Sequence, residues 1–245
     1  MSLPEVVSPQ EWRAARIALL EQEKALTRQR DAVSEARRRL PMVEVTKDYR
    51  FTGPQGEVGL LDLFEGRLQL IVGHFMFHPE WEDGCPSCSA GADEVAGGLL
   101  EHLHVRDTTL AYVSRAPLER IERYKAKKEW TFPWYSSAGS DFNYDFHATL
   151  DASVAALEYN FRGADALPDS FTDPAGQPFD MPGTSCFLRV DDRVFHTYSS
   201  YARGAEWTGG SYAFLDLTAL GRQEDWEQPE GRSEAVRSNR PDFAS

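Results

Sequence analysis

The apolar run at residues 68–77 leads almost directly into two cysteines, Cys85 and Cys88, which have a Cys-x-x-Cys spacing. Its branched and aromatic side chains predict a buried central strand, and residues 89–104 predict the helix that follows. The two thiols are therefore expected where a strand turns into a helix. At this spacing they can form a disulfide, alternate as attacking and resolving sulfurs, or bind a metal.

Strands and helices alternate along most of the remaining chain. A hairpin with a Gly-rich turn precedes the buried strand, and Gly97-Gly98 weakens the helix after the cysteines. The order hairpin, strand, helix, strand, helix, strand predicts an α/β fold with a mixed sheet that is covered on both faces. The further elements are strands at 48–51, 58–61, 108–113 and part of 130–135, a helix at 117–128, and a final hairpin at 185–190 and 194–198.

A long helix is predicted between Ser8 and Pro41. Ser8 can cap its start, Glu11 can close a capping box, and Pro41 stops it. Its apolar residues recur every seven positions in one narrow line, which predicts packing on its own domain or on a second subunit; we expect the subunit contact, and hence a homodimer. The line consists of Trp12, Leu19, Leu26, Val33 and Leu40.

These patterns divide the chain into three parts. Residues 1–41 are expected to form an N-terminal helical extension, residues 42–222 the α/β domain, and residues 223–245 a disordered, polar tail. Within the domain, residues 136–180 are rich in Asp, Gly and Pro and predict an irregular insertion.

The net charge and the apolar pattern argue against several classes of partner. A net charge of −13 disfavours nucleic acids and anionic membranes, because both are bound through clustered Lys and Arg. No apolar stretch reaches the roughly 18 residues of a membrane helix, and the first residues lack a signal-peptide pattern. We therefore expect a cytoplasmic protein without nucleic-acid or membrane partners. In a reducing compartment, Cys-x-x-Cys is typical of redox or metal chemistry.

The predicted helix start gives the two cysteines different tasks. The N–H groups and the dipole of the helix stabilise a thiolate at Cys85, and Cys88 lies one turn further along, within reach. Cys85 is then the attacking sulfur, and Cys88 closes the disulfide. Acidic neighbours raise thiol pKa values, so we expect only modest activation. These neighbours are Glu80, Glu82, Asp83, Asp93 and Glu94.

Two other interpretations of the cysteines remain open. They can be inert apolar groups at a strand–helix junction. With His74 and His78 they also offer four zinc ligands, although a histidine inside an apolar strand is more often hydrogen-bonded in the core. We expect no metal and no cofactor. The third cysteine, Cys186, shares a strand face with Leu188 and Val190 and is expected to fill the core, with a redox role as the minority alternative.

Two stretches that mix polar and aromatic residues are weaker candidates for a site. The first, residues 140–147, offers acid, base or ligand groups, but an aromatic-anchored loop with solvated carboxylates is the favoured interpretation. The second is suited to holding an anion or a loop. The groups in question are Asp141, Asp145 and His147 in the first stretch, and Tyr198, Tyr201 and Arg203 in the second.

Five blocks of the sequence carry a family resemblance, at residues 70–77, 84–89, 113–118, 140–147 and 194–204. Together they resemble a bacterial family known as domain of unknown function 899, which has a thioredoxin-like fold. The resemblance extends over nearly the whole chain, to about residue 225. It implies a thioredoxin-like three-layer sandwich with a mixed central sheet, preceded by a helix.

By analogy with thioredoxin-like proteins, Cys85 and Cys88 match the redox pair, and Pro182 matches their cis-proline. Thioredoxins carry Trp before the first cysteine, where this chain has Gly84, and peroxiredoxins place Thr or Ser where it has Glu82. The second departure disfavours a peroxiredoxin mechanism. The residues expected to bind a substrate near the thiols are Trp81, Pro182, Gly183, Tyr198, Tyr201 and Arg203.

The sequence thus predicts a thiol–disulfide oxidoreductase. Its partner is expected to be a disulfide- or thiol-containing substrate or a redox partner protein. The alternative is a redox-sensing binding or assembly module without turnover, in which oxidation changes the oligomeric state or the binding of a partner.

Overall fold

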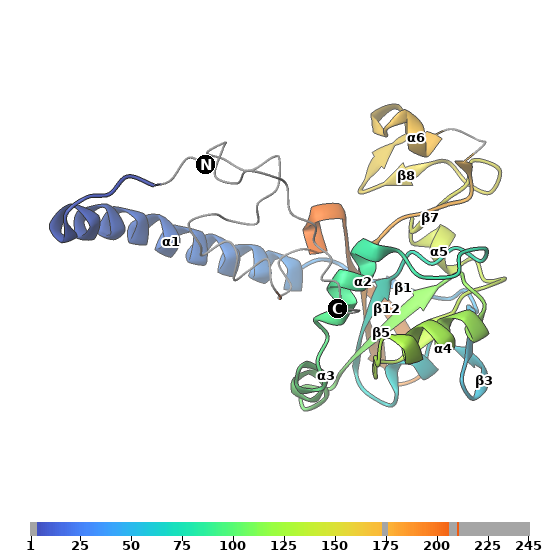
Figure 1. Ribbon diagram of the computed structural model, residues 1–245. Coiled ribbons are helices and arrows are strands. Elements are labelled where there is room, and N and C mark those ends of the chain that lie inside the picture. The colour runs from blue at the N-terminus through green and yellow to red at the C-terminus, as the bar shows by residue number, and fades with distance from the viewer. Residues whose placement is uncertain (1–3, 173–175, 206–209, 211–245) are drawn as a thin grey trace. The chain divides into compact units, whose positions relative to one another are not determined.

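The computed structural model describes residues 4–172, 176–205 and 210. The chain divides into two compact units, one with residues 1–41 and 212–238 and the other with residues 42–211 and 239–245. In its described part the first unit is dominated by one helix, and the second is an α/β domain (Figure 1). The predicted tail at 223–245 and the predicted domain end at residue 222 lie outside the described residues.

Helix α1 runs from Pro9 to Arg38, between the predicted start and stop signals. Its capping box is present: the Glu11 amide donates to Ser8 Oγ over 3.3 Å, and the Ser8 amide donates to the Glu11 carboxylate over 2.9 Å. The structure describes α1 completely, and none of its residues is buried. The apolar line is exposed at all five positions, from 42% for Val33 to 61% for Trp12.

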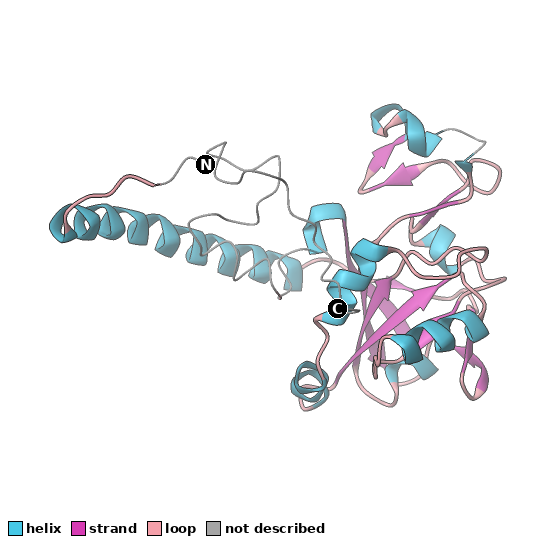
Figure 2. Ribbon diagram, in the orientation of Figure 1, coloured by secondary structure: helices cyan, strands magenta, loops and turns pink. Residues whose placement is uncertain are grey.

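Eight strands of the described chain form one mixed sheet (Figure 2). Its strand order is β1-β12-β11-β4-β5-β6-β2-β3. Strand β5 pairs in parallel with β4 and β6, and the other pairs are antiparallel. The strands are β1 Val43–Glu44, β2 Arg50–Gly53, β3 Gly56–Gly59, β4 Gln69–His74, β5 Thr108–Ser114, β6 Trp134–Ser136, β11 Gly183–Val190 and β12 Arg193–Tyr201.

The centre of the sheet has the strand order of a thioredoxin-like core. The parallel pair β4 and β5, joined through helices, is extended by the antiparallel hairpin β11–β12, which gives the order β12-β11-β4-β5. The predicted fold class, an α/β three-layer sandwich with a mixed central sheet, is confirmed. The predicted buried strand at 68–77 is present as the shorter β4.

Helices cover both faces of this sheet. On one face, α2 (Pro86–Asp93), α3 (Gly97–His104) and α4 (Leu118–Lys127) pack over a cluster rich in aromatic residues, and Figure 1 shows α4 in front of the strands. On the other face, the 3-10 turn η1 (Asp62–Phe64) and the short helix α5 (Phe142–Asp145) pack over a second cluster. No helix in the described residues combines the length and apolarity that crossing a bilayer requires.

Alternate residues of the central strands divide between the two clusters. On β5, Ala111 and Val113 belong to the cluster under η1 and α5, whereas Leu110 and Tyr112 face the cluster under α2, α3 and α4. The sheet is therefore buried on both sides, as the continuous apolar run of the strand predicted.

The single helix predicted at 89–104 is wrong. The chain forms two helices, because α2 ends at Asp93 and α3 starts at Gly97. The Val95 amide donates to the Ala92 carbonyl over 3.0 Å, which closes the last turn of α2. Glycine is a poor helix former, so Gly97 and Gly98 favour a break here and α3 begins with them.

The predicted irregular insertion contains several very short elements. Besides α5, these are β7 Thr149–Leu150, β8 Glu158–Tyr159, β9 Arg162–Gly163, η2 Ala164–Ala166, α6 Asp169–Thr172 and β10 Phe179–Asp180. A small apolar cluster joins the insertion to the end of β12. Its buried members are Leu150, Tyr159, Met181 and Tyr201.

Candidate functional site

The two cysteines lie at the carboxyl end of β4, where the chain turns into α2. Cys85 is the N-cap residue of α2, and Pro86 occupies the first helical position. The Cys85 amide donates to the Met76 carbonyl over 2.9 Å, and the Ser89 amide donates to the Cys85 carbonyl over the same distance. These bonds fix Cys85 at the positive end of the helix dipole, as the sequence predicted.

Close packing beneath Cys85 explains the glycine that precedes it. A Cβ on Gly84 would lie 2.5 Å from an edge carbon of the Phe75 ring and 3.0 Å from the Tyr124 ring. One turn later, Ser89 Oγ donates to the Cys85 carbonyl over 2.9 Å and lies 2.8 Å from Tyr124 Oη. The contacts with Tyr124 of α4 therefore hold the backbone of the Cys-x-x-Cys turn in place.

The thiols of Cys85 and Cys88 contact each other. All three cysteines are thiols in this structure, and each is half-buried. The pKa of Cys88 is raised well above its ordinary value, first by its hydrogen bond to Cys85 and then by burial. Cys88 is therefore held in its protonated form and donates a hydrogen bond to Cys85.

A buried ion pair, which the sequence did not reveal, lies behind the dithiol. Arg115 Nε donates to Asp180 Oδ1 over 2.6 Å, and Thr149 Oγ1 donates to the same oxygen over 2.8 Å. Asp180 also acts on Cys88, whose pKa its charge raises further. Arg115 directly follows β5 and Asp180 ends β10, so two elements far apart in the sequence meet here. No motif pointed to Asp180.

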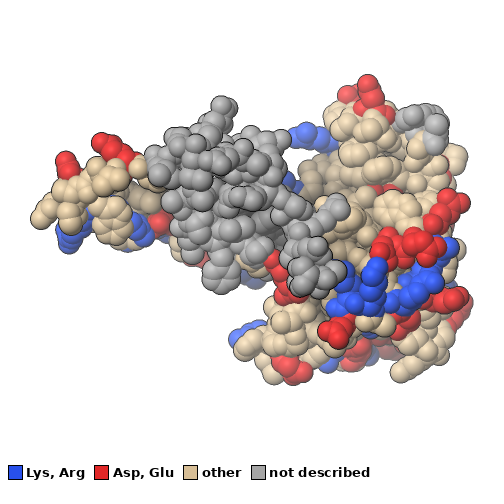
Figure 3. All heavy atoms as spheres, in the orientation of Figure 1, with Lys and Arg blue, Asp and Glu red and all other residues tan. Residues whose placement is uncertain are grey.

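Three of the five acidic residues that flank the cysteines in the sequence lie within ion-pair distance of basic residues in α4 or directly after it. Asp83 pairs with Lys127 over 2.6 Å, and Asp93 with Lys128 over 3.2 Å. Glu82 lies 3.5 Å from Arg120. Figure 3 shows acidic and basic side chains side by side on this face. The carboxylate that raises the pKa of Cys88 belongs to Asp180, which is distant in the sequence but close in space. It is not one of the five acidic residues that flank the cysteines in the sequence.

Two tyrosines complete the surroundings of Cys88. Burial raises the pKa of Tyr112 to about 12, and the negative charge that Cys88 carries once it has ionised adds to this shift. Tyr159 behaves in the same way, with burial as the larger cause. Tyr159 Oη also donates to the Pro182 carbonyl over 2.9 Å, so the insertion is tied to the segment that precedes β11.

The structure brings together only some of the predicted binding residues. Pro182 and Gly183 lie at the start of β11, and Gly183 pairs with Tyr201 on one side and His74 on the other. A Cβ on Gly183 would lie 2.8 Å from the Tyr201 ring. The match of Pro182 to a cis-proline is wrong, because the cis peptide bond in the described residues is Gln177–Pro178.

The other predicted binding residues lie on the opposite face of β12, in a 3-10 turn and in a loop. Tyr198 pairs with Cys186, three positions before Tyr201, and so points to the opposite face of β12. Arg203 is exposed in η4 (Ala202–Ala205). Trp81 is 41% exposed in the turn between β4 and α2, where Arg120 donates to its carbonyl over 2.6 Å.

His74 lies on the other face of the sheet from the thiols and has hydrogen-bond partners of its own. Its Nδ1 is 3.2 Å from Asn143 Oδ1, and its Nε2 is 2.9 Å from Ser185 Oγ. Ser185 Oγ lies 2.8 Å from Ser199 Oγ, and Ser199 Oγ lies 2.8 Å from His196 Nε2. Burial lowers the pKa of His74 to about 4. It is the hydrogen-bonded core histidine that the sequence favoured.

The four ligands of the zinc alternative do not come together in the part of the chain that the structure describes. No three His, Cys, Asp or Glu side chains there come together as a metal site. His74 faces Asn143 and Ser185, whereas the cysteines pack with the cluster on the opposite face.

The stretch at 140–147 is an aromatic-anchored element, as the favoured interpretation predicted. Phe142 and Phe146 are buried, with ring centroids 4.7 Å apart. Lys47 pairs with Asp141 over 2.8 Å and with Asp145 over 2.7 Å. The stretch packs over the face away from α2.

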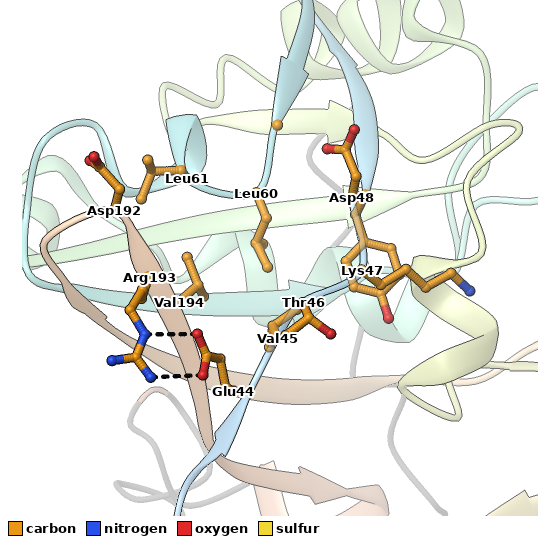
Figure 4. Close-up of a pocket in the computed structure, with 12 residues that line it drawn as sticks. Glu44, Val45, Thr46, Lys47, Asp48, Leu60, Leu61, Asp192, Arg193 and Val194 are labelled. Carbon is orange, nitrogen blue, oxygen red and sulfur yellow. Dashed lines mark hydrogen bonds and ion pairs between the residues drawn. The ribbon is translucent and has the colours of Figure 1, made fainter.

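An open cavity of about 290 Å³ lies at the other end of the sheet from the thiols (Figure 4). It is lined by Val45, Leu60 and Val194, and at its rim Arg193 forms two 2.7 Å bonds with Glu44. Arg193 begins β12 and pairs with Val190, far along the hairpin from Gly183. The cavity therefore has no part in the chemistry of the dithiol.

Several solved structures are similar to the chain. A mutant of PrxQ from Xylella fastidiosa is 15% identical with a TM-score of 0.41, over 64% of this chain and 83% of that chain. The bacterioferritin comigratory protein of Xanthomonas campestris is 11% identical with a TM-score of 0.44, over 66% and 87%. A hypothetical protein from Sinorhizobium meliloti is 13% identical with a TM-score of 0.40, over 72% and 84%. No curated protein is similar to the chain.

A family model gives the more extensive match. It covers residues 1–240 and therefore both the helix α1 and the α/β domain. The resemblance that the five sequence blocks carried is confirmed by this match. The chain belongs to the family described as bacterial protein of unknown function, DUF899.

Proposed function

We propose that this protein is a thiol–disulfide oxidoreductase in which Cys85 attacks and Cys88 resolves. The observation that carries the proposal is the contact between two thiols of unequal character at the start of α2. Cys85 caps the helix, and Cys88, with its raised pKa, provides a proton donor beside it. Inert core cysteines need neither the helix start nor the mutual contact.

The reaction consists of two exchanges. The Cys85 thiolate attacks one sulfur of a substrate disulfide, so that a mixed disulfide forms and the second substrate sulfur leaves as a thiolate. Cys88 then loses its proton and attacks Cys85 Sγ, which forms the Cys85–Cys88 disulfide and releases the first substrate sulfur as a thiolate. Two electrons pass from the dithiol to the substrate, and a dithiol reductant restores the protein.

The residues around the thiols support these steps. The Met76 amide faces Cys88 and lowers its pKa, against the larger opposing effects of Cys85 and burial. Pro182 and Gly183, at the start of β11, are proposed to offer backbone to a disulfide-bearing segment, and Trp81 offers an exposed aromatic surface in the turn before α2. These three residues are proposed to contact the substrate.

Turnover with a disulfide-containing protein substrate, with dithiothreitol as the electron source, tests the proposal. Cys85→Ser is expected to reduce the rate by about 100-fold or more, because the nucleophile is lost. Cys88→Ser is expected to accumulate a mixed disulfide on Cys85, detected as added mass. Cys186→Ser is the matched control and should retain the wild-type rate. A wild-type rate no higher than that of dithiothreitol alone would reject the proposal.

A redox-sensing assembly module is the second candidate, and the exposed apolar line of α1 favours it. In that case oxidation of Cys85 and Cys88 changes the association of the protein without turnover. Light scattering on the oxidised and reduced forms distinguishes the two candidates. If the mass is the same in both redox states and turnover is observed, the sensing module is rejected and the oxidoreductase remains.

A further inference from the structure

One face of α1 carries an exposed apolar line. On the helix the line consists of Trp12, Leu19, Leu26 and Val33, which are 61%, 48%, 51% and 42% exposed, and Leu40 lies two residues beyond the end of α1. The four helical positions span three heptads on a helix of 30 residues, which is about 45 Å long. An isolated helix of this polarity gains little from its own apolar residues, so such a line indicates packing against another helix.

Small residues lie beside the line at the same spacing. Ala18, Ala25 and Ala32 each precede a residue of the line. Alanine side chains let two helix axes approach closely, toward the short end of the usual 8–10 Å range. The line and its alanines therefore form a strip that is apolar, narrow and regular, and that suits a second helix of the same kind.

The charges of α1 are distributed unequally along its length. Residues 9–23 carry three acidic and two basic side chains, whereas residues 24–38 carry five basic and two acidic ones. In a parallel pair, the two basic halves would lie together and repel each other. In an antiparallel pair, each basic half lies against the acidic half of the other helix, and the helix dipoles also oppose.

We propose that α1 pairs with α1 of a second copy of this chain in antiparallel orientation, centred on Leu26. This alignment places Leu19 of one copy level with Val33 of the other, because these positions are equally far from Leu26. Trp12 then lies just beyond the C-terminal end of the other helix, where Leu40 follows. The alanines Ala18, Ala25 and Ala32 of one helix then face the same alanines of the other helix. The proposal concerns association and goes beyond the oxidoreductase function.

The mass of the full chain in solution tests the association. The wild-type protein, kept reduced, is expected to have twice the mass of one chain by light scattering. Leu26→Glu buries a charge at the centre of the pair and should return the mass to that of one chain. The matched control is Ile17→Glu, since Ile17 is also exposed, at 46%, but lies about 150° around the helix from the line. It should leave the double mass unchanged.

Two outcomes overturn the association. A wild-type protein with the mass of a single chain means that the line is covered by another segment of the same chain or is not covered at all. A double mass that survives Leu26→Glu means that the copies associate through another surface.

Disulfide trapping tests the orientation. Leu26→Cys, in a background with Cys85→Ser, Cys88→Ser and Cys186→Ser, should form a covalent dimer on mild oxidation, because the two thiols meet at the centre. Leu19→Cys in the same background lies about 21 Å from its own copy in the antiparallel pair, far beyond disulfide range. It should stay uncrosslinked alone and form a covalent dimer when mixed with Val33→Cys. Self-linking of Leu19→Cys as fast as that of Leu26→Cys would show a parallel pair and overturn the orientation.

Discussion

Two polar clusters lie near the carboxyl end of β4, on opposite faces of the sheet, and they differ in access to solvent. On the α2 face, the half-buried Cys85 and Cys88 contact each other at a helix start. On the α5 face, His74 contacts Asn143 and Ser185, and all three are at most 3% exposed. The second cluster has the nucleophile–base–orienter order of a hydrolytic site but no path for a substrate.

The arrangement of side chains alone therefore does not make a catalytic site. Ser185, His74 and Asn143 satisfy one another's hydrogen bonds in the core, which is what buried polar groups need for stability. The thiols of Cys85 and Cys88 contact each other and are only half-buried. Residues on one face of β4 therefore support the fold, whereas the segment that follows β4 on the other face is available for chemistry.

Arg115→Met should give the largest loss of stability on the thiol face. It leaves the Asp180 carboxylate buried without its charged partner, and breaking such a pair costs about 3–5 kcal/mol of unfolding free energy. Urea unfolding at about pH 7 measures the effect. The double variant Arg115→Met/Asp180→Leu removes both charges and should recover much of the loss. A loss below about 1 kcal/mol for the single variant would mean that solvent reaches the pair.

The second-largest expected effect is a loss of stability at acidic pH, which depends on His74. The folded protein keeps His74 neutral down to about pH 4, whereas the unfolded chain binds its proton near pH 6.5. The unfolded state therefore binds more protons between these values, and stability is complete above pH 6.5 and falls as the pH approaches 4. The expected loss from this residue is about 3 kcal/mol. Burial also lowers the pKa of His196, which adds a loss of the same sign.

His74→Gln separates this effect from general acid unfolding. It is less stable than the wild type at neutral pH, because the imidazole contacts change, but its loss between about pH 6.5 and pH 4 should be clearly smaller. Turnover per folded molecule should match the wild type in this variant. A turnover defect as large as that of Cys85→Ser would contradict the separation of the two faces.

Gly84→Ala should have a moderate effect confined to the thiol face. The added Cβ meets the rings of Phe75 and Tyr124, and such overpacking costs about 1–3 kcal/mol. Because the same contact positions the start of α2, turnover should fall as well. Thermal unfolding and turnover measured on the same sample check both effects. Unchanged values would mean that the turn before Cys85 is not held by this packing.

Gly91→Ala should have the smallest effect and the opposite sign. A Cβ at this position in α2 meets nothing within 4 Å, so the substitution replaces a poor helix former without a clash. The expected gain is about 0.5–1 kcal/mol, with unchanged turnover. A loss of turnover here would show that α2 must move during the reaction.

The sequence predicted those parts of the molecule that depend on neighbouring residues. Ser8, Pro9 and Glu11 predicted the start of α1, and the continuous apolar run predicted β4, because capping and strand burial depend on the local sequence pattern. The break between α2 and α3 was missed, since one or two glycines do not decide between a weakened helix and two helices. The position of Cys85 at a helix start also followed from local pattern.

The part of the site that depends on tertiary contacts could not be predicted. Asp180 and Arg115 are 65 positions apart and meet because β10 is brought beside the end of β5. The grouping of Tyr198 with Tyr201 failed because residues three apart on a strand face opposite ways, and the strand assignment stopped at residue 198. Asp83 and Asp93, two acidic neighbours of the cysteines, are likewise paired with Lys127 and Lys128, which are more than 30 positions away, so no local pattern indicated these contacts.

The central claim is that Cys85 and Cys88 form a two-electron couple suited to exchange with disulfides. A redox titration of the Cys186→Ser protein in defined thiol–disulfide buffers, with mass spectrometry to locate the bridge, tests it directly. We predict one bridge between Cys85 and Cys88, with a midpoint between about −300 and −120 mV, the range of exchanging dithiols. A couple that never forms this bridge across the whole range of buffers, or one that stays oxidised far below about −300 mV as structural disulfides do, would contradict it.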